Sequence, residues 1–183
     1  MSKNGKRILA IIIVLLLGSQ FSYGIYRSYQ GGNASPPVSS NQLVPSQKQT
    51  QPLDFTLPDL KGGTITLSQY QGKKPVILDF FATWCPNCRR AMPSLNRYYQ
   101  TYKDEVEVIG INMQERKQLV EDFISSRDIS YPIALDPLQQ ASRLFGIRYT
   151  NTHILIDKAG NFVREIPGDI RESDIQALIK LSL

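Results

Sequence analysis

The sequence contains very few metal-ligating side chains, because its 183 residues include only two cysteines and one histidine. A structural zinc site usually takes four cysteine or histidine ligands. With three such residues in total and no second Cys-x-x-Cys pair, a zinc ribbon within one chain is excluded. The two cysteines, Cys85 and Cys88, therefore need another explanation.

A strong excess of one charge is also lacking. The net charge is +5, and the basic residues are scattered, with several at the extreme N-terminus. Nucleic acid is therefore not an expected partner. Apolar residues make up 42% of the chain and charged residues 20%, which is typical of a globular domain rather than of a disordered one.

Residues 1–29 carry the pattern of an export signal. Three basic residues precede an unbroken apolar run at 8–17, and apolar character continues to Tyr26, close to the roughly 20 residues that a spanning helix needs. We expect an uncleaved single-pass anchor in the cell membrane, with the following domain on the extracytoplasmic side. A signal cleaved near Ser22 or Gly24 is the alternative, whereas a buried helix of the folded domain fits the flanking charge poorly.

The anchor is followed by two regions of different composition. Residues 30–51 are rich in glycine, serine, proline and glutamine, and such a segment buries too little apolar surface to offset the entropy of ordering it. We expect a flexible linker there. Residues 52–183 have the composition of one compact domain.

Within that domain, strand and helix patterns alternate. The pattern predicts a hairpin over 54–70, a strand buried on both faces at 75–82, a helix after the cysteines and a strand at 106–113. The next helix is expected to turn Leu119, Val120, Phe123 and Ile124 inward. A short strand at 131–135, a helix at 138–145, a second hairpin over 152–166 and a last helix at 170–181 complete a mixed α/β sheet.

The cysteines stand in the stretch FFATWCPNCRR, directly after the buried strand and at the start of the next helix. Pro86 suits the first helical position. Unpaired N–H groups at a helix N-terminus stabilise an anion, so the Cys85 thiolate is favoured, and the thiolate is the attacking species in disulfide exchange. Cys88 lies one turn later. A disulfide across two residues closes almost no loop and adds little stability, so we expect redox chemistry.

The segment DFFATWCPNCRRAMPSL, together with DFTLPDLKGGTITLSQYQGK before it and VIGINMQE after it, resembles the TlpA/ResA-type membrane-anchored thiol–disulfide oxidoreductases of the thioredoxin fold. The likeness runs from Leu53 to the C-terminus. It implies a central mixed sheet flanked by helices, with an N-terminal hairpin and an inserted helix. It also implies exchange, with reduction favoured, of disulfides in exported proteins such as apocytochromes, and recharging by a membrane electron donor. We expect a monomer with no cofactor beyond the redox-active Cys85–Cys88 pair.

The resemblance also implies roles for individual residues. Cys85 is the nucleophile, Cys88 is the resolving thiol, and Asp79 matches a buried acid that relays a proton to or from the second cysteine. The indole of Trp84 offers a flat apolar surface to a partner. The residues expected to contact the partner are Trp84, Pro86, Thr150, Asn151 and Thr152.

One departure from the family pattern concerns the partner groove. Asn151 stands where the family has a cis-proline. A cis bond before any other residue costs about 2.5–4 kcal/mol, so we expect a trans bond, a reshaped loop and altered substrate binding.

Two other functions are compatible with these residues. His153 could join Cys85 and Cys88 in a copper site of the kind that the Sco copper-delivery family uses, since thiolate and imidazole suit Cu(I). The Cys-x-x-x-Cys spacing of that family and the alternation of strand side chains, which could turn His153 away, argue against it. A non-enzymatic docking module with the same fold is the other alternative.

Overall fold

The computed structural model describes residues 53–182. The predicted anchor at 1–29 and the predicted linker at 30–51 lie outside these residues. Within 53–182, no helix is both long enough and apolar enough to cross a membrane.

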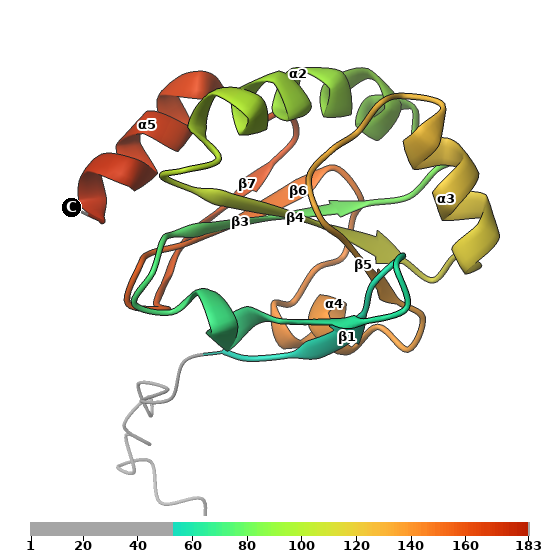
Figure 1. The fold of residues 1–183 in the computed structure, drawn as a ribbon, viewed down its shortest axis with the longest axis horizontal. Helices are drawn as coiled ribbons and strands as arrows, with labels where there is room; N and C mark the ends of the chain where they lie inside the picture. Colours follow the sequence, from blue (N-terminus) through green and yellow to red (C-terminus); the bar gives the residue numbers. More distant parts are fainter. Residues whose placement is uncertain (1–52, 183) are drawn as a thin grey trace, which may run out of the picture. The chain divides into compact units, whose positions relative to one another are not determined.

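A five-stranded mixed sheet forms the centre of the domain, with the strand order β5-β4-β3-β6-β7 (Figure 1). Three strands are parallel: β3 (Val76–Phe81), β4 (Glu107–Met113) and β5 (Ile133–Asp136). Two antiparallel strands, β6 (Thr152–Ile156) and β7 (Phe162–Pro167), continue the sheet beyond β3. The predicted mixed sheet is confirmed.

Three helices cover one face of this sheet, as the upper layer of Figure 1 shows. They are α2 (Pro86–Tyr102), α3 (Lys117–Ser125) and α5 (Glu172–Leu181). The prediction for α3 is wrong in one residue, because Leu119 is 47% exposed while Val120 and the following apolar pair are buried. Leu119 lies at the edge of the apolar stripe, where a helix turns its side chains toward solvent.

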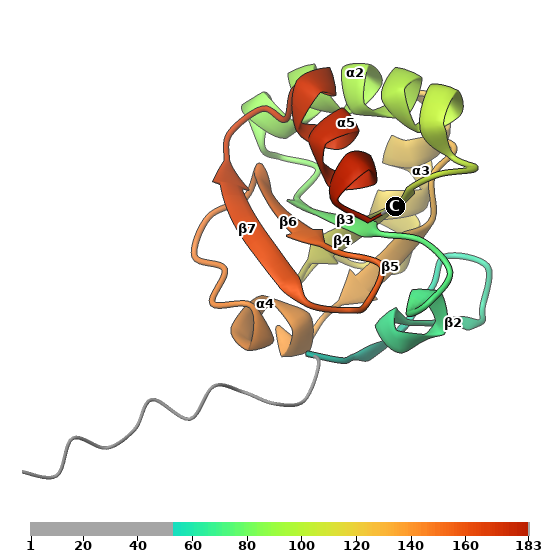
Figure 2. The same cartoon turned by 90° about the vertical axis from the view of Figure 1, so that its left-hand side faces the viewer.

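The opposite face is covered by shorter elements (Figure 2). They are the hairpin of β1 (Thr56–Pro58) and β2 (Thr64–Thr66), the 3-10 turn η1 (Leu67–Tyr70) and the short helix α4 (Gln140–Leu144). An antiparallel bridge between Asp59 and Ala134 ties the hairpin to β5. The predicted N-terminal hairpin is confirmed.

The central strand β3 is buried along its whole length. Successive side chains of a strand point to opposite faces, so Leu78 and Phe80 pack toward the hairpin and α4. Ile77 and Phe81 pack toward α2, α3 and α5. Asp79 shares the face of Ile77 and Phe81, which places a carboxylate beneath α2.

Candidate active site

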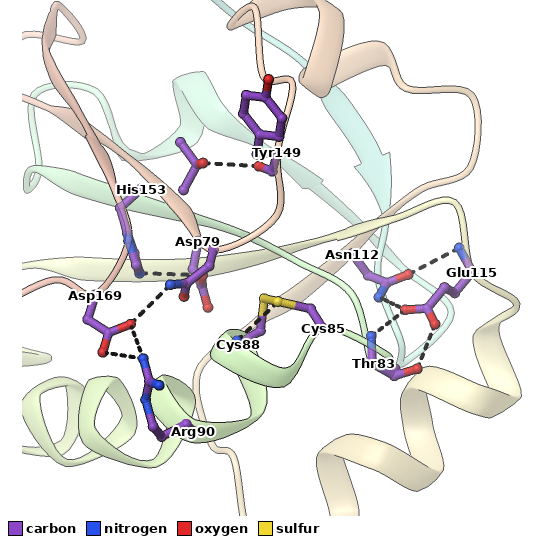
Figure 3. The surroundings of a disulfide bond; sticks show 12 residues. Asp79, Thr83, Cys85, Cys88, Arg90, Asn112, Glu115, Tyr149, His153 and Asp169 are labelled. Carbon is purple, nitrogen blue, oxygen red and sulfur yellow. Dashed lines mark hydrogen bonds and ion pairs between the residues drawn. A yellow bond between two sulfur atoms is a disulfide. The ribbon is translucent and has the colours of Figure 1, made fainter.

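The two cysteines form a disulfide at the start of α2, with their Cα atoms 5.3 Å apart (Figure 3). Cys85 is the residue that precedes the first helical residue, Pro86. The backbone N–H of Cys88 donates to the Cys85 sulfur at 3.1 Å. In the reduced protein the same N–H would stabilise a Cys85 thiolate. Both sulfur-bearing residues are buried, whereas Trp84 beside them is 67% exposed.

The loop between β3 and the cysteines is held by a carboxylate clamp that the sequence did not predict. Glu115 accepts the Thr83 backbone N–H at 2.7 Å and the Thr83 hydroxyl at 2.6 Å. The side-chain amide of Asn112 donates to the same carboxylate at 2.7 Å. Hydrogen bonds to an ionised acceptor are stronger than neutral ones. The clamp therefore fixes the chain two residues before Cys85, and its only sequence signal was an acid just after a buried strand.

Asp79 is 2% exposed and has two polar partners. The Tyr131 hydroxyl donates to its Oδ2 at 3.1 Å, and the His153 Nε2 lies 3.4 Å from its Oδ1. Burial raises the pKa of Asp79, and the opposing effects of His153 and Tyr131 leave that pKa above its ordinary value. A carboxyl with a raised pKa is suited to accept and return a proton near neutral pH.

Tyr131 reaches Asp79 because the neighbouring strand carries a glycine at this point. Gly110 on β4 is the residue directly beside Asp79 in the sheet. A Cβ at Gly110 would lie 3.1 Å from the Tyr131 ring and 2.6 Å from a methyl carbon of Ile133. Burial, and then the charge of Asp79, raises the pKa of Tyr131 well above its ordinary value, so this phenol stays protonated as a donor.

The loop at Asn151 has a trans peptide bond, since no cis bond occurs within residues 53–182. The expected trans geometry is confirmed, and Asn151 takes a left-handed conformation with φ of 59°. Its backbone N–H donates to Phe80 at 2.8 Å, and its carbonyl accepts from Gly168 at 2.7 Å. Its side-chain amide donates to Asp169 at 3.0 Å. This amide, and then Arg90 at 3.1 Å, holds the pKa of Asp169 below its usual range.

The five residues expected to contact a partner are therefore not equally accessible. Trp84 and Pro86 are exposed, and Thr150 is half-buried. The side chains of Asn151 and Thr152 are buried. The Thr152 hydroxyl donates to the Tyr149 carbonyl at 3.0 Å, so it shapes the loop from within. In Figure 3 the ring of Tyr149, which is 77% exposed, points away from the disulfide.

His153 faces the same side of the sheet as Asp79, because the pairing of β6 with β3 sets the two residues directly opposite each other. The expectation that strand alternation turns His153 away from the site is therefore wrong. The imidazole pairs with Asp79, and within residues 53–182 no three His, Cys, Asp or Glu side chains gather as a metal site. The copper-delivery alternative is not favoured.

Comparison with known proteins agrees with this geometry. Residues 49–165 match the AhpC/TSA family. The chain is also 34% identical, over 96% of its length and 95% of the relative's, to the thiol–disulfide oxidoreductase ResA of Geobacillus thermodenitrificans. The chain belongs to the ResA-type thiol–disulfide oxidoreductases of the AhpC/TSA family.

Solved structures support the same assignment. The exposed lipoprotein thioredoxin Etrx1 of Streptococcus pneumoniae is 28% identical, with a TM-score of 0.62 over 70% of this chain and 98% of that one. StoA from Bacillus subtilis, at 24% identity, has the same fold, with a TM-score of 0.61 over 70% of this chain and 97% of that chain. The predicted thioredoxin fold is confirmed. This ResA-type protein is an oxidoreductase that exchanges thiols and disulfides with partner proteins.

Proposed function

We propose that this ResA-type protein works outside the cytoplasm, held in the cell membrane by residues 1–29, and reduces disulfides in exported proteins such as apocytochromes. The basic residues before the apolar run, the linker composition of 30–51 and the resemblance to TlpA/ResA-type proteins support this proposal. A membrane electron donor would return electrons to the Cys85–Cys88 disulfide. We propose that the protein acts as a monomer and needs no further cofactor.

The observation that carries the proposed chemistry is the disulfide at the N-terminus of α2, on the sheet face where Asp79 is buried. In the reducing direction, the Cys85 thiolate attacks one sulfur of a partner disulfide, and the other partner sulfur leaves as a thiolate. Cys88 then gives its proton to Asp79 and attacks the Cys85 sulfur. The new disulfide releases the second partner thiolate, and both thiolates take protons from water.

The partner surface includes the exposed Trp84 and Pro86. Because the backbone N–H and carbonyl of Asn151 are already paired within the chain, they are not open to a partner. Thr150, one residue earlier, takes part in no hydrogen bond among residues 53–182. We therefore propose that an extended partner segment pairs with the backbone of Thr150 in a β-like manner. The buried Asn151 and Thr152 would hold that loop in place.

A trapping experiment in the full-length chain tests the proposed roles. The Cys88→Ala variant keeps the nucleophile and lacks the resolving thiol, so it should accumulate mixed disulfides through Cys85 with exported thiol proteins. Cys85→Ala is the matched control and should accumulate far fewer. Equal yields of trapped partner from the two variants, or no trapped exported protein, would contradict the proposal.

The direction of electron flow has its own test. A midpoint potential near that of thioredoxin, about −270 mV, together with Cys85 and Cys88 reduced in cells, supports a reductant. A potential near that of a strong periplasmic oxidant, about −120 mV, with an oxidised pair in cells would show the opposite direction.

A further inference from the structure

A polar pocket of about 300 Å³ lies between α2 and the β6 side of the sheet. Its lining includes Asp79, Leu95, Asn151, His153, Arg90 and Asp169. The side chains of Arg90 and Asp169 are 67% and 48% exposed, whereas those of Asp79 and His153 are only 3% and 2% exposed. The pocket therefore connects buried titratable groups with solvent, and it has ample room for water.

His153 is the unexplained group in this pocket. Its Nε2 lies 3.4 Å from Asp79, while its Nδ1 is buried with no hydrogen-bond partner within residues 53–182. An unpaired buried polar atom in a native protein calls for an explanation such as an ordered water or a functional role. An imidazole with one nitrogen on a carboxylate and the other unpaired has the arrangement of a proton carrier.

Cys88 lies on the buried face of α2, the same face that covers the pocket lined by His153. Cys88, Met92 and Leu95 are the buried residues of the helix, and the last two line the pocket together with Asp79. Figure 3 draws Asp79 on the side of the disulfide that faces His153. A proton that leaves Cys88 for Asp79 therefore arrives next to the imidazole.

We propose that His153 takes over the proton that Asp79 accepts from Cys88 and releases it to water in the pocket. This inference rests on the proposed role of Asp79. His153 acts through Asp79 and touches neither the cysteines nor a partner in that role, so it is a positioning residue for the exchange reaction.

The steps balance as follows. The Cys88 thiol loses a proton to the Asp79 carboxylate, and the resulting thiolate attacks the Cys85 sulfur of a mixed disulfide, from which the partner thiolate leaves. The protonated Asp79 then transfers the proton to the Nε2 of His153, which can accept it because the neutral imidazole carries its own proton on Nδ1. The imidazolium then loses its Nε2 proton to a water molecule in the pocket, which leaves Asp79 ionised and His153 neutral, with its proton again on Nδ1, for the next cycle. In the opposite redox direction every transfer reverses.

The other polar groups around the pair leave this path open. Tyr131 occupies the second oxygen of Asp79 and stays protonated, so it does not compete for the proton. At the mouth of the pocket, Asp169 attracts an imidazolium, and its own charge is balanced by Arg90. The phenol of Tyr98 on α2 also lines the pocket.

Two substitutions of His153 in the full-length chain distinguish its role in proton transfer from its role as a hydrogen-bonding partner of Asp79. His153→Gln keeps a hydrogen-bonding partner for Asp79 and cannot carry a proton, and His153→Phe removes both. The rate at which Cys88 resolves a mixed disulfide is followed in saturating oxidised glutathione by the fluorescence of Trp84, the only tryptophan. Ile154→Val, on the other face of β6, is the matched control.

Both His153 variants should move the pH profile of resolution to higher pH, since both lack the imidazolium whose charge lowers the pKa of Asp79. For each pH unit by which the profile moves, resolution at a fixed pH on the acidic side becomes about tenfold slower. The rate is measured from about pH 5 to pH 8. Ile154→Val should keep the wild-type profile. A His153→Gln profile that coincides with the wild type would overturn the inference, because hydrogen bonding alone would then suffice.

Asp79→Asn distinguishes this failure from failure of the proposed mechanism. If Asp79→Asn flattens the profile while His153→Gln leaves it unchanged, only the role of His153 is wrong. If Asp79→Asn leaves the profile unchanged, the role of Asp79 is wrong as well.

A measurement on the unmodified protein covers the case in which a variant misfolds. The single imidazole gives one set of NMR signals, and these should show an inflection at the titration of Asp79. A signal without that inflection would also overturn the inference.

Discussion

The two faces of the same central strands are packed in opposite ways. On β3, Leu78 and Phe80 pack into an apolar layer with Ile154 of β6. One residue along each strand, Asp79 and His153 are equally buried on the other face and form a polar pair. Burying a carboxylate is unfavourable unless it is paired and hydrogen-bonded. The comparison shows that the Asp79–His153 pair lies on the face that carries the disulfide, while the neighbouring residues of the same two strands pack into an apolar layer on the opposite face.

Leu78→Ala should have the largest effect on stability and none on the redox chemistry. Truncating a fully buried leucine removes apolar burial and leaves a cavity, which costs about 2–5 kcal/mol of the free energy of unfolding. Denaturant unfolding would measure this loss. The midpoint potential of Cys85–Cys88 should stay at the wild-type value, and a clear shift would contradict the separation of the two faces.

Gly110→Ala should disturb the polar face by overpacking. The new methyl would lie 2.6 Å from an Ile133 methyl carbon and 3.1 Å from the Tyr131 ring. Such overpacking costs about 1–3 kcal/mol, and it should push the Tyr131 hydroxyl off Asp79. Unfolding experiments would show the loss, and a crystal structure would show the ring displaced. Unchanged stability would mean that this glycine is not what lets Tyr131 approach Asp79.

Tyr131→Phe should have the smallest effect, about 0.5–1.5 kcal/mol for one hydrogen bond. Because the hydroxyl lowers the pKa of Asp79, its removal raises that pKa further, and the loss of stability should grow as pH rises. Tyr98→Phe is the control, since the Tyr98 hydroxyl makes no hydrogen bond among residues 53–182. A loss that is the same at low and high pH would show that Tyr131 does not stabilise the ionised Asp79.

Local patterns in the sequence predicted much of this arrangement. The apolar run around Asp79 predicted a strand buried on both faces, and the position of Cys85 after that run predicted a helix N-terminus. These features depend on residues that are neighbours in the chain.

The pairing of side chains that are distant in sequence could not be predicted in the same way. That His153 lies opposite Asp79 follows from the register of β6 on β3, and that Tyr131 reaches the same carboxylate follows from the glycine on β4. The clamp from Glu115 to Thr83 likewise joins the ends of two separate strands. No periodicity in one segment specifies such contacts.

The free energy of unfolding of the oxidised protein, compared between wild type and Asp79→Asn across about pH 4 to pH 8, tests most directly whether a carboxyl is buried at a cost on the disulfide face. The folded-state pKa of Asp79 is raised by burial. The wild type therefore keeps its full stability below the unfolded-state pKa and loses stability as pH rises through the folded-state pKa, by about 1.4 kcal/mol for each unit by which the pKa is raised. The asparagine variant lacks this loss. We predict that it becomes increasingly more stable than the wild type as pH rises and that the gap then levels off. A gap that does not change with pH, or one that favours the wild type at neutral pH, would contradict this account.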